Sequence, residues 1–307
     1  MARGITAEIF EKDHVGAGAS GNALGLFNPR FSAQRGPESD FYGSAYALAE
    51  RTFKSLPNIG YHPCGSLHLV TDEDKRKRFT GLIENWGWHS EHAKVISSDE
   101  ATQIAVIHLE QDALHLPESG SVSPALVCEA LAQGTPLHSE SVETITASDA
   151  GWLLNGRRYD AVVIASGADC LRYEQVADLP LHTVRGQITY AKATELSGTL
   201  KTNLCFGGYC STSVQHEHAI GSTFQPWLTE TIIREEDHVQ ILSQLETAVP
   251  ALRGQFVPAG GRAALRTASK DRVPVIGAVS GFDTLYISSA HGSHGLLSSL
   301  LAAEVIA

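Results

Sequence analysis

Basic residues are scarce in this sequence. Its 307 residues include 23 lysines and arginines against 34 aspartates and glutamates, and the formal net charge is -11. Because binding to a nucleic-acid backbone needs clustered lysine and arginine side chains, this balance excludes a broad electrostatic footprint on DNA or RNA. It leaves room for a local basic pocket.

Cysteine pairs and long apolar runs are also missing. The five cysteines include no C-x-x-C pair, and an odd, scattered set indicates buried thiols in a reducing compartment rather than a disulfide framework or a zinc site. The sequence contains no run of about 18 apolar residues. Its N-terminus lacks the charged head and apolar core of a signal peptide. We therefore expect a cytoplasmic protein without a membrane span.

The spacing of apolar residues predicts a mixture of helices and strands. The run AVVIA at 161–165 has no polar alternation, which is typical of a strand buried on both faces in a parallel sheet. Residues 97–117 show no regular period and are expected to be irregular. Further strands are expected at 5–10, 66–71, 142–146, 151–154 and 283–290, with a β-rich stretch from 184 to 225. Helices are expected at 37–56, from Asp72, and at 124–132, 231–249 and 296–307.

The stretch HVGAGASGN, residues 14–22, contains a literal G-x-G-x-x-G. A dinucleotide fingerprint requires its first glycine directly after a strand and a helix directly after its last. Here five residues separate the predicted strand from Gly16, and Gly25 and Pro29 break any helix that would follow. The context therefore predicts a different kind of glycine loop.

Glu11 has the position of a ribose-binding carboxylate, because it ends a predicted strand that follows what resembles the last turn of a helix at residues 1–4. The alternative is a surface glutamate at a strand end, and the residues alone leave both open. If Glu11 has the ribose role, we expect the glycine fingerprint to lie before Met1, so that the sequence begins inside a fold.

Several motifs in consistent order resemble the D-amino acid oxidase superfamily, which includes glycine and sarcosine oxidases. They are FEKD…GASGNALGLFNPRFS, CGSLHLVTDE, VRGQITY, LCFGGYCS, RTASKDRVPVIG and AHGSHGLLSSLLAAEVIA. The resemblance implies an α/β, two-domain flavoprotein, in which a mostly antiparallel β substrate domain is inserted into a Rossmann-like FAD-binding domain. The implied FAD-binding domain comprises 1–60, 118–183 and 258–307, and the substrate domain 61–117 and 184–257.

FAD is the cofactor that this resemblance implies. The GASGN loop would bring backbone amides to the cofactor, and the turn before the last helix would stabilise negative charge on the flavin ring. A plain glycine-rich turn is the alternative for the GASGN loop. The implied cofactor-binding residues are Glu11, Lys12, Ala19, Ser20, Gly21, Asn22, Gly25, Val142, Ser166, Gly167, Gly292, Ser293, His294, Gly295 and Leu296.

The same resemblance assigns Arg266 to the substrate carboxylate, which a planar guanidinium binds in a bidentate manner, and Tyr209 to substrate orientation. The alternatives are a surface arginine paired with Asp271 and a core or edge tyrosine. His291 and His294 are not expected to hold a metal, because two histidines without a third ligand do not make a site. No metal is therefore expected.

Within the superfamily, the likeness is strongest to the flavin part of bifunctional tRNA wobble-uridine modification proteins. It implies FAD-dependent oxidation of a secondary amine, with loss of the carboxymethyl group from 5-carboxymethylaminomethyl-(2-thio)uridine in tRNA. A methyltransferase domain or partner, absent from this sequence, would supply the tRNA-binding surface that an acidic chain lacks. Two rivals stay open: a free-standing oxidase of small amines, similar to glycine oxidase, and a truncated chain that binds no FAD.

Overall fold

The computed structural model describes residues 4–30 and 32–307, so the helix turn expected at residues 1–4 lies largely outside the described residues. None of the helices in the described ranges is long and apolar enough to cross a membrane. The helices are α1 (Pro37–Ser55), α2 (Glu73–Trp86), α3 (Ser98–Ala105), α4 (Pro124–Ala132), α5 (Glu235–Ala248) and α6 (Gly295–Ile306), with 3-10 turns η1 (Gly167–Arg172), η2 (Ser197–Thr199) and η3 (Pro250–Leu252).

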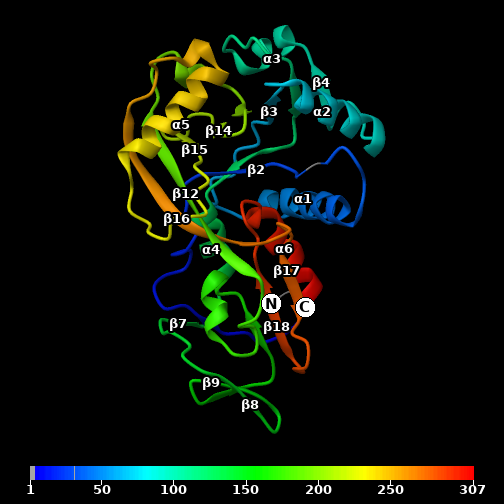
Figure 1. Cartoon of the computed structure of the whole chain (residues 1–307), viewed down its shortest axis with the longest axis vertical. Coiled ribbons are helices and arrows are strands. Elements are labelled where there is room, and N and C mark those ends of the chain that lie inside the picture. The colour runs from blue at the N-terminus through cyan, green and yellow to red at the C-terminus, as the bar shows by residue number, and fades with distance from the viewer. Residues whose placement is uncertain (1–3, 31) are drawn as a thin grey trace.

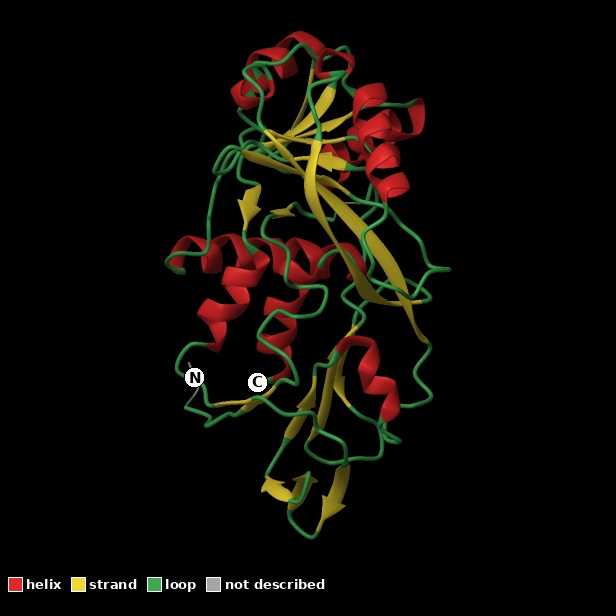
Figure 2. Cartoon of the chain, turned by 90° about the vertical axis from the view of Figure 1, so that its left-hand side faces the viewer, coloured by secondary structure: helices red, strands yellow, loops and turns green. Residues whose placement is uncertain are grey.

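An eight-stranded, mostly antiparallel sheet forms one end of the molecule (Figure 1). Its two long strands, β16 and β12, pair antiparallel and run from this end toward the middle of the molecule (Figure 2). The order across the sheet is β16 (Pro258–Ser269), β12 (Leu181–Lys192), β15 (Glu217–Gly221), β14 (Tyr209–Cys210), β13 (Asn203–Cys205), β3 (Ser66–Leu69), β5 (Ala113–Leu116) and β4 (Lys94–Ile96). This sheet confirms the β-rich stretch expected after residue 184.

Helices cover one face of this sheet and only part of the other. Leu67 and Leu204 pack against α5 and α3 in one buried core. Leu114 points to the opposite face, where Phe79 of α2 covers β3, β5 and β4. Helix α2 begins where the Asp72 side chain accepts a hydrogen bond from the Lys75 amide. Helix α2 therefore does not cover the part of this second face that β16, β12, β15 and β14 form.

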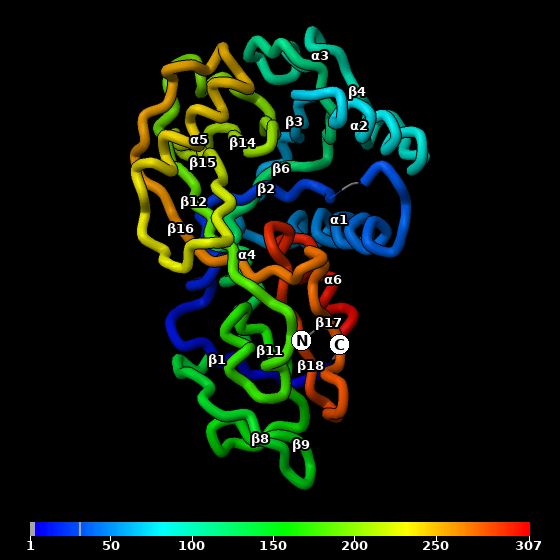
Figure 3. Tube along the Cα trace, viewed as in Figure 1, coloured from blue at the N-terminus to red at the C-terminus, as the bar shows by residue number. Residues whose placement is uncertain are grey.

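The opposite end of the molecule carries several small sheets, and Figure 3 places β1, β11 and β18 there. Parallel pairing joins β1 to β7 and β11 to β18, as expected for a nucleotide-binding domain. The strands are β1 (Ile9–Phe10) with β7 (Leu137–His138); β11 (Val162–Ile164) with β18 (Leu285–Ser289) and β17 (Val275–Ala278); β8 (Ile145–Ser148) with β9 (Gly151–Leu154) and β10 (Arg157–Tyr159); and β2 (Gly25–Phe27) with β6 (Gly120–Val122).

Four local predictions were wrong. Residues 97–117 are not irregular, because Ser97 and Glu100 form a capping box that starts α3, and β5 follows. The strand expected at 142–146 begins only at Ile145. The strand expected at 5–10 comprises only the two residues that pair with β7. In AVVIA the middle Val163 is 49% exposed, because β11 is hydrogen-bonded only to β18 and one of its faces is uncovered.

The middle of the molecule is an apolar core between the two ends. Phe27 of β2 packs there against Phe53 of α1 and Leu297 of α6. This core fixes the start of α6 and the residues around β2 relative to the large sheet. The proposed division into two domains, with boundaries at 183/184 and 257/258 among them, stays a prediction. Strand β12 crosses the first of these boundaries and pairs along its length with β16, which begins at the second.

Candidate functional site

Side chains from four neighbouring strands share the incompletely covered face of the large sheet. Directly paired residues point to the same face, and the register aligns Arg262 of β16, Ile188 of β12, Gly221 of β15 and Tyr209 of β14. Arg266 lies four residues after Arg262 on β16 and therefore on this face too. The structure thus brings both predicted substrate residues, Arg266 and Tyr209, to one surface.

The Arg266 side chain has room because Gly186, its diagonal neighbour on β12, lacks a side chain. A Cβ atom at Gly186 would lie 2.4 Å from Arg266 Nη2, which leaves no space for any other residue. Arg266 Nη2 donates to the carbonyl oxygen of Thr223 at 2.9 Å, and among the described residues no carboxylate pairs with it. The pairing with Asp271 considered above is therefore wrong, since that carboxylate binds Ser269 and the amide of Val273.

Burial sets the charge state of these groups. It raises the pKa of the Tyr209 phenol, so that this hydroxyl stays protonated and can donate a hydrogen bond. Burial lowers the pKa of Arg266, which nevertheless remains charged because an arginine does not lose its proton in proteins. Burial, with the positive charges of Arg30 and Arg266, lowers the pKa of His294 to about 4. The face therefore carries the Arg266 cation next to neutral hydrogen-bonding groups.

The GASGN loop lies over the same face and is tied to it by Arg262. This guanidinium donates to Asn22 Oδ1 and to the carbonyl of Ala17, both at 3.1 Å, and to the carbonyl of Gly18. A Cβ atom at Gly21 would lie 2.7 Å from Arg262 Nη2 and 2.3 Å from a loop carbonyl. Gly21 is thus required by loop packing, while Ala19 and Ser20 are exposed.

This loop is not a dinucleotide fingerprint, as the sequence context predicted. Residues 12–24 form turns and bends and lead into β2, and no helix starts at them. Gly25 opens β2, where a Cβ atom would lie 2.8 Å from Pro124 and 3.2 Å from Leu296 of α6. The glycine therefore allows β2 to pack closely against the start of α6.

The turn before α6 reaches the same region. The Gly292 amide donates to the carbonyl of Thr267 on β16 at 2.9 Å, and Ser293 next to it is exposed. His294 is the N-cap residue of α6 and makes an edge-to-face contact with Tyr42, at 5.5 Å between ring centres. The amides of Gly295 and Leu296 open the helix and have no acceptor among the described residues, which makes them donors for a negative group.

The remaining predicted cofactor residues gather at the carboxyl ends of the parallel strands. Glu11 follows β1, and among the described residues its carboxylate accepts only from the nearby Asp13 amide, at 3.0 Å. Lys12 pairs with Asp169 of η1 at 2.7 Å, which joins the end of β1 to the turn after β11 that carries Ser166 and Gly167. The carboxyl edge of parallel strands is where nucleotide ligands bind.

Val142 lies beside this edge but outside any strand. Its carbonyl accepts from the Tyr173 hydroxyl at 2.8 Å, just beyond η1. Gly167, in contrast, is close to the sheet: a Cβ atom there would lie 3.2 Å from Thr267 Oγ1, on the residue that also holds Gly292. The predicted residues thus form two groups, one at the strand ends and one on the sheet face, which meet at Thr267.

The residues present fit an FAD molecule on two observations. Glu11 offers a carboxylate at a parallel strand end, and the start of α6 offers two amides that have no acceptor among the described residues. FAD has groups that match both, because its ribose carries hydroxyls and its pyrophosphate and reduced ring carry negative charge. No three metal-ligating side chains cluster in the described part of the chain.

Sequence reasoning missed several residues of the site. Arg262 and Tyr190 hold the glycine loop, the latter by accepting from the Ala23 amide at 3.2 Å. Arg30 lies behind His294, where it donates to the Tyr42 hydroxyl and pairs with Glu38. The strand β16 itself was not predicted. The available signal for Arg262 is its spacing of four residues from Arg266, which in an extended strand places two arginines on one face.

Acidification is expected to destabilise the fold through three partly buried histidines. Burial lowers the pKa of His68, His291 and His294 to about 4, against about 6.5 in the unfolded chain. The unfolded state therefore binds more protons, so stability falls as pH drops below about 6.5 and levels off near 4. At about pH 5 we expect a loss of about 1–2 kcal/mol per histidine.

Urea denaturation at several pH values measures this effect. The His294→Gln variant should show a smaller loss between about pH 7 and about pH 5, whereas replacing the exposed His89 by Asn should leave the slope unchanged. A free energy of unfolding that stays constant over this range would show that these rings are protonated in the fold.

Comparison with known proteins extends over the whole chain. Residues 1–307 match the family described as FAD dependent oxidoreductase (DAO). The chain is 29% identical over 332 residues to the tRNA 5-methylaminomethyl-2-thiouridine biosynthesis bifunctional protein MnmC of Nitrosospira multiformis, covering 100% of this chain and 53% of that protein. It is also 29% identical over 350 residues to MnmC of Chromohalobacter salexigens, covering 99% and 50%. The chain thus spans about half the length of these relatives.

Solved structures share the fold. Glycine oxidase from Geobacillus kaustophilus superposes with a TM-score of 0.82 at 23% identity, covering 99% of this chain and 87% of that one. Iminodiacetate oxidase from Chelativorans sp. BNC1 gives a TM-score of 0.80 at 18% identity, covering 99% and 88%. These neighbours confirm the α/β flavoprotein fold expected from the sequence. With a carboxylate at the parallel strand ends, a glycine loop and a helix start at the sheet face, and a family match over residues 1–307, the chain belongs to the DAO family of FAD-dependent oxidoreductases.

Proposed function

We propose that this chain removes the carboxymethyl group from 5-carboxymethylaminomethyl-(2-thio)uridine in tRNA. The observation that carries the proposal is Arg266, a partly buried cation on the face that the glycine loop and α6 approach, which has no carboxylate partner in the described part of the chain. A buried charge is costly unless it is paired. The substrate arm ends in an N-substituted glycine, whose carboxylate supplies that partner. The match to MnmC proteins along the whole chain supports this substrate.

Each residue of the face has a defined task in this reaction. Arg266 holds the carboxylate by two parallel hydrogen bonds and thereby fixes the adjacent CH₂ and amine. Tyr209, kept protonated by burial, orients the substrate by donating a hydrogen bond. FAD, when bound, would accept the hydride, and with it the two electrons, that the CH₂ group loses, while the amine nitrogen gives up one proton to water. Water then hydrolyses the oxidised C–N bond, so that the aminomethyl group stays on the uridine and glyoxylate leaves.

The residues at the strand ends and on α6 hold the cofactor in this proposal. Glu11 accepts from the ribose hydroxyls, and Lys12, Ser166, Gly167 and Val142 line the same edge. The loop residues Ala19, Ser20, Gly21, Asn22 and Gly25 and the turn residues Gly292, Ser293, His294, Gly295 and Leu296 complete the set.

A small-molecule substrate is the second candidate. The fold neighbours include oxidases of glycine and of iminodiacetate. Iminodiacetate contains the same N-carboxymethyl amine as the modified uridine, so that Arg266 would bind either. The proposals differ only in what is attached to the amine nitrogen.

Further partners follow from the tRNA proposal. The MnmC relatives are bifunctional and about twice as long, and a methyltransferase domain or partner would add the RNA-binding surface that a chain with a net charge of -11 lacks. A tRNA substrate places the reaction in the cytoplasm.

Mass spectrometry of tRNA nucleosides tests the proposed function. Protein loaded with FAD should convert the carboxymethylaminomethyl nucleoside in tRNA to the aminomethyl nucleoside and release an equal amount of glyoxylate. The Arg266→Ala variant, loaded with the same amount of FAD, is the matched control and should be strongly impaired. Turnover of iminodiacetate or glycine without any reaction on the tRNA would decide for the small-molecule candidate. Protein that takes up no FAD would refute both.

A further inference from the structure

The loop between β15 and α5, residues 222–234, exposes large apolar side chains. Phe224 is 58% exposed, Trp227 73% and Ile232 70%. Single exposed apolar residues are normal on the surface of a soluble protein, but a group of them on one loop indicates a binding surface.

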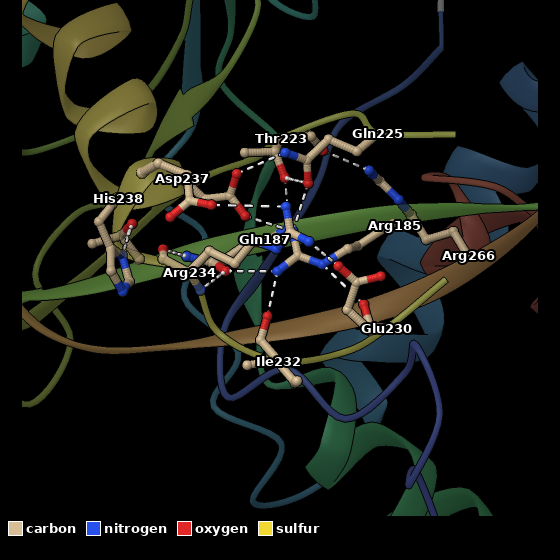
Figure 4. A network of polar contacts seen from close by, with 12 residues as sticks. Arg185, Gln187, Thr223, Gln225, Glu230, Ile232, Arg234, Asp237, His238 and Arg266 are labelled. Atoms are coloured by element: carbon tan, nitrogen blue, oxygen red, sulfur yellow. Dashed lines mark hydrogen bonds and ion pairs between the residues drawn. The ribbon is translucent and has the colours of Figure 1, made fainter. Parts of the chain in front are cut away.

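A buried ion pair holds this loop in place (Figure 4). Arg185 is fully buried and pairs with Asp237 of α5 at 2.5 Å, and it also donates to Gln187 Oε1 of its own strand at 2.9 Å. Its other hydrogen bonds go to the loop. They reach Gln225 Oε1 at 2.5 Å and the carbonyls of Glu230 and Ile232 at 3.0 and 2.5 Å. One guanidinium thus fixes three points of the loop, so that its exposed side chains are presented in a fixed arrangement.

The loop borders the candidate site. Arg266 donates to the carbonyl of Thr223, and the backbone of Gln225 exchanges two hydrogen bonds with Arg185 of β12. The side chains of Thr223 and Gln225 bond to each other on the Arg185 side. Because side chains alternate along extended backbone, Phe224 lies on the opposite face, the one that carries Arg266.

Trp227 lies at the tip of the same loop. The Leu228 amide donates to the Gln225 carbonyl at 3.3 Å, which closes a tight turn with Pro226 at its second position and Trp227 at its third. Phe224 and Trp227 are therefore three residues apart on a fixed turn at the rim of the Arg266 face. We call these two side chains the aromatic rim.

The charged residues around the aromatic rim indicate which class of partner it can bind. The only cation of the loop, Arg234, already pairs with Glu230 and Glu236, and the first turn of α5 adds the exposed Glu235. Such a rim offers nothing to phosphate groups. It offers flat apolar faces, on which an unpaired nucleobase stacks without any charge.

We propose that the aromatic rim stacks on the base of the nucleoside whose carboxylate arm is bound by Arg266, and that it thereby selects a nucleoside substrate over a small free amine. This inference rests on the proposed function, because it takes the modified uridine as the substrate. The aromatic rim binds the base at one end of the substrate, and Arg266 binds the carboxylate at the other.

Steady-state kinetics with two substrates tests this proposal on the full chain loaded with FAD. One substrate is an anticodon stem-loop RNA that carries 5-carboxymethylaminomethyluridine, and the other is iminodiacetate. The Phe224→Ala/Trp227→Ala variant should lose about 10-fold or more in kcat/KM for the RNA, mainly through KM, and stay within about 2-fold for iminodiacetate. The Trp227→Phe variant, which keeps an aromatic face, should retain RNA turnover.

Two substitutions serve as comparisons. Val239→Ala, at an exposed apolar residue of α5 outside the loop, should leave both substrates unaffected. Arg266→Ala should impair both. Equal losses on both substrates in the double variant would show that the loop only supports the site, and unchanged RNA turnover would show that the loop serves another partner, such as a protein. Either result overturns the stacking proposal while the proposed function stands. Absence of RNA turnover by the unsubstituted chain overturns both.

Discussion

The Asp237→Ala variant is expected to unfold with a free energy about 3–5 kcal/mol below that of the unsubstituted protein. Asp237 is the only carboxylate among the described residues that pairs with Arg185, and both side chains are almost completely buried. Removing it leaves a guanidinium in the interior with no opposite charge, and it also frees the Gln225 amide that donates to Asp237 Oδ1 at 2.7 Å. Urea denaturation followed by circular dichroism measures the loss.

Two further variants separate the ion pair from general disruption of α5. Glu236→Ala removes the neighbouring exposed carboxylate and should change the free energy of unfolding by less than about 0.5 kcal/mol. Replacing both partners, in Arg185→Met/Asp237→Leu, should cost less than the two single substitutions together, because no unpaired charge remains. A loss below about 1 kcal/mol for Asp237→Ala would contradict the buried pair.

The Arg266→Ala variant is expected to lose about 2–5 kcal/mol of binding to the substrate carboxylate, or ~30-fold to ~1000-fold and more in kcat/KM. Most of the effect should fall on KM, because the guanidinium binds a group that does not itself react. Arg266→Lys should recover only part of it, since an ammonium cannot form two parallel hydrogen bonds. Binding of FAD, followed by flavin absorbance during dialysis, should be unchanged.

Arg262 is the matched control, because it lies four residues away on the same face of β16 and is bonded to the glycine loop instead. Arg262→Ala should loosen the loop and weaken FAD binding, with little effect on KM once the cofactor is saturating. Glu11→Ala should likewise weaken FAD binding. If both arginine variants changed only FAD binding, Arg266 would have no role in binding the substrate carboxylate.

The parts of the fold with strong local signals were predictable. Helix α1 begins at Pro37, as its proline and acidic residues indicate, and α2 begins after its cap, Asp72. The glycine loop was recognised as something other than a dinucleotide fingerprint because a fingerprint needs a strand before it and a helix after it. The start of α3 could also have been predicted, because Ser97 and Glu100 have the spacing of a capping box.

The parts that depend on distant contacts were not predictable. Arg185 and Asp237 are 52 residues apart, and no sequence pattern near either residue identifies the other as its partner. Arg185 did carry one signal, because a charged residue inside the apolar strand VRGQITY needs a buried partner. Arg266 and Tyr209 were assigned through family resemblance, since only the sheet register places them on one face. Their roles, like those of the cofactor residues, stay predictions.

The paired strands β12 and β16 have a mechanical consequence. Their register runs without a break from Leu181 and Ser269 to Tyr190 and Gly260, so they behave as one stiff two-stranded beam. Near one end of the beam, Thr267 touches the turns at Gly167 and Gly292, and further along Arg262 is anchored to the glycine loop. A rotation of one end of the molecule relative to the other would require both strands to bend together. In the proposed reaction, we therefore expect entry and exit of the substrate to depend on the loops that border these two strands rather than on a hinge between the two ends.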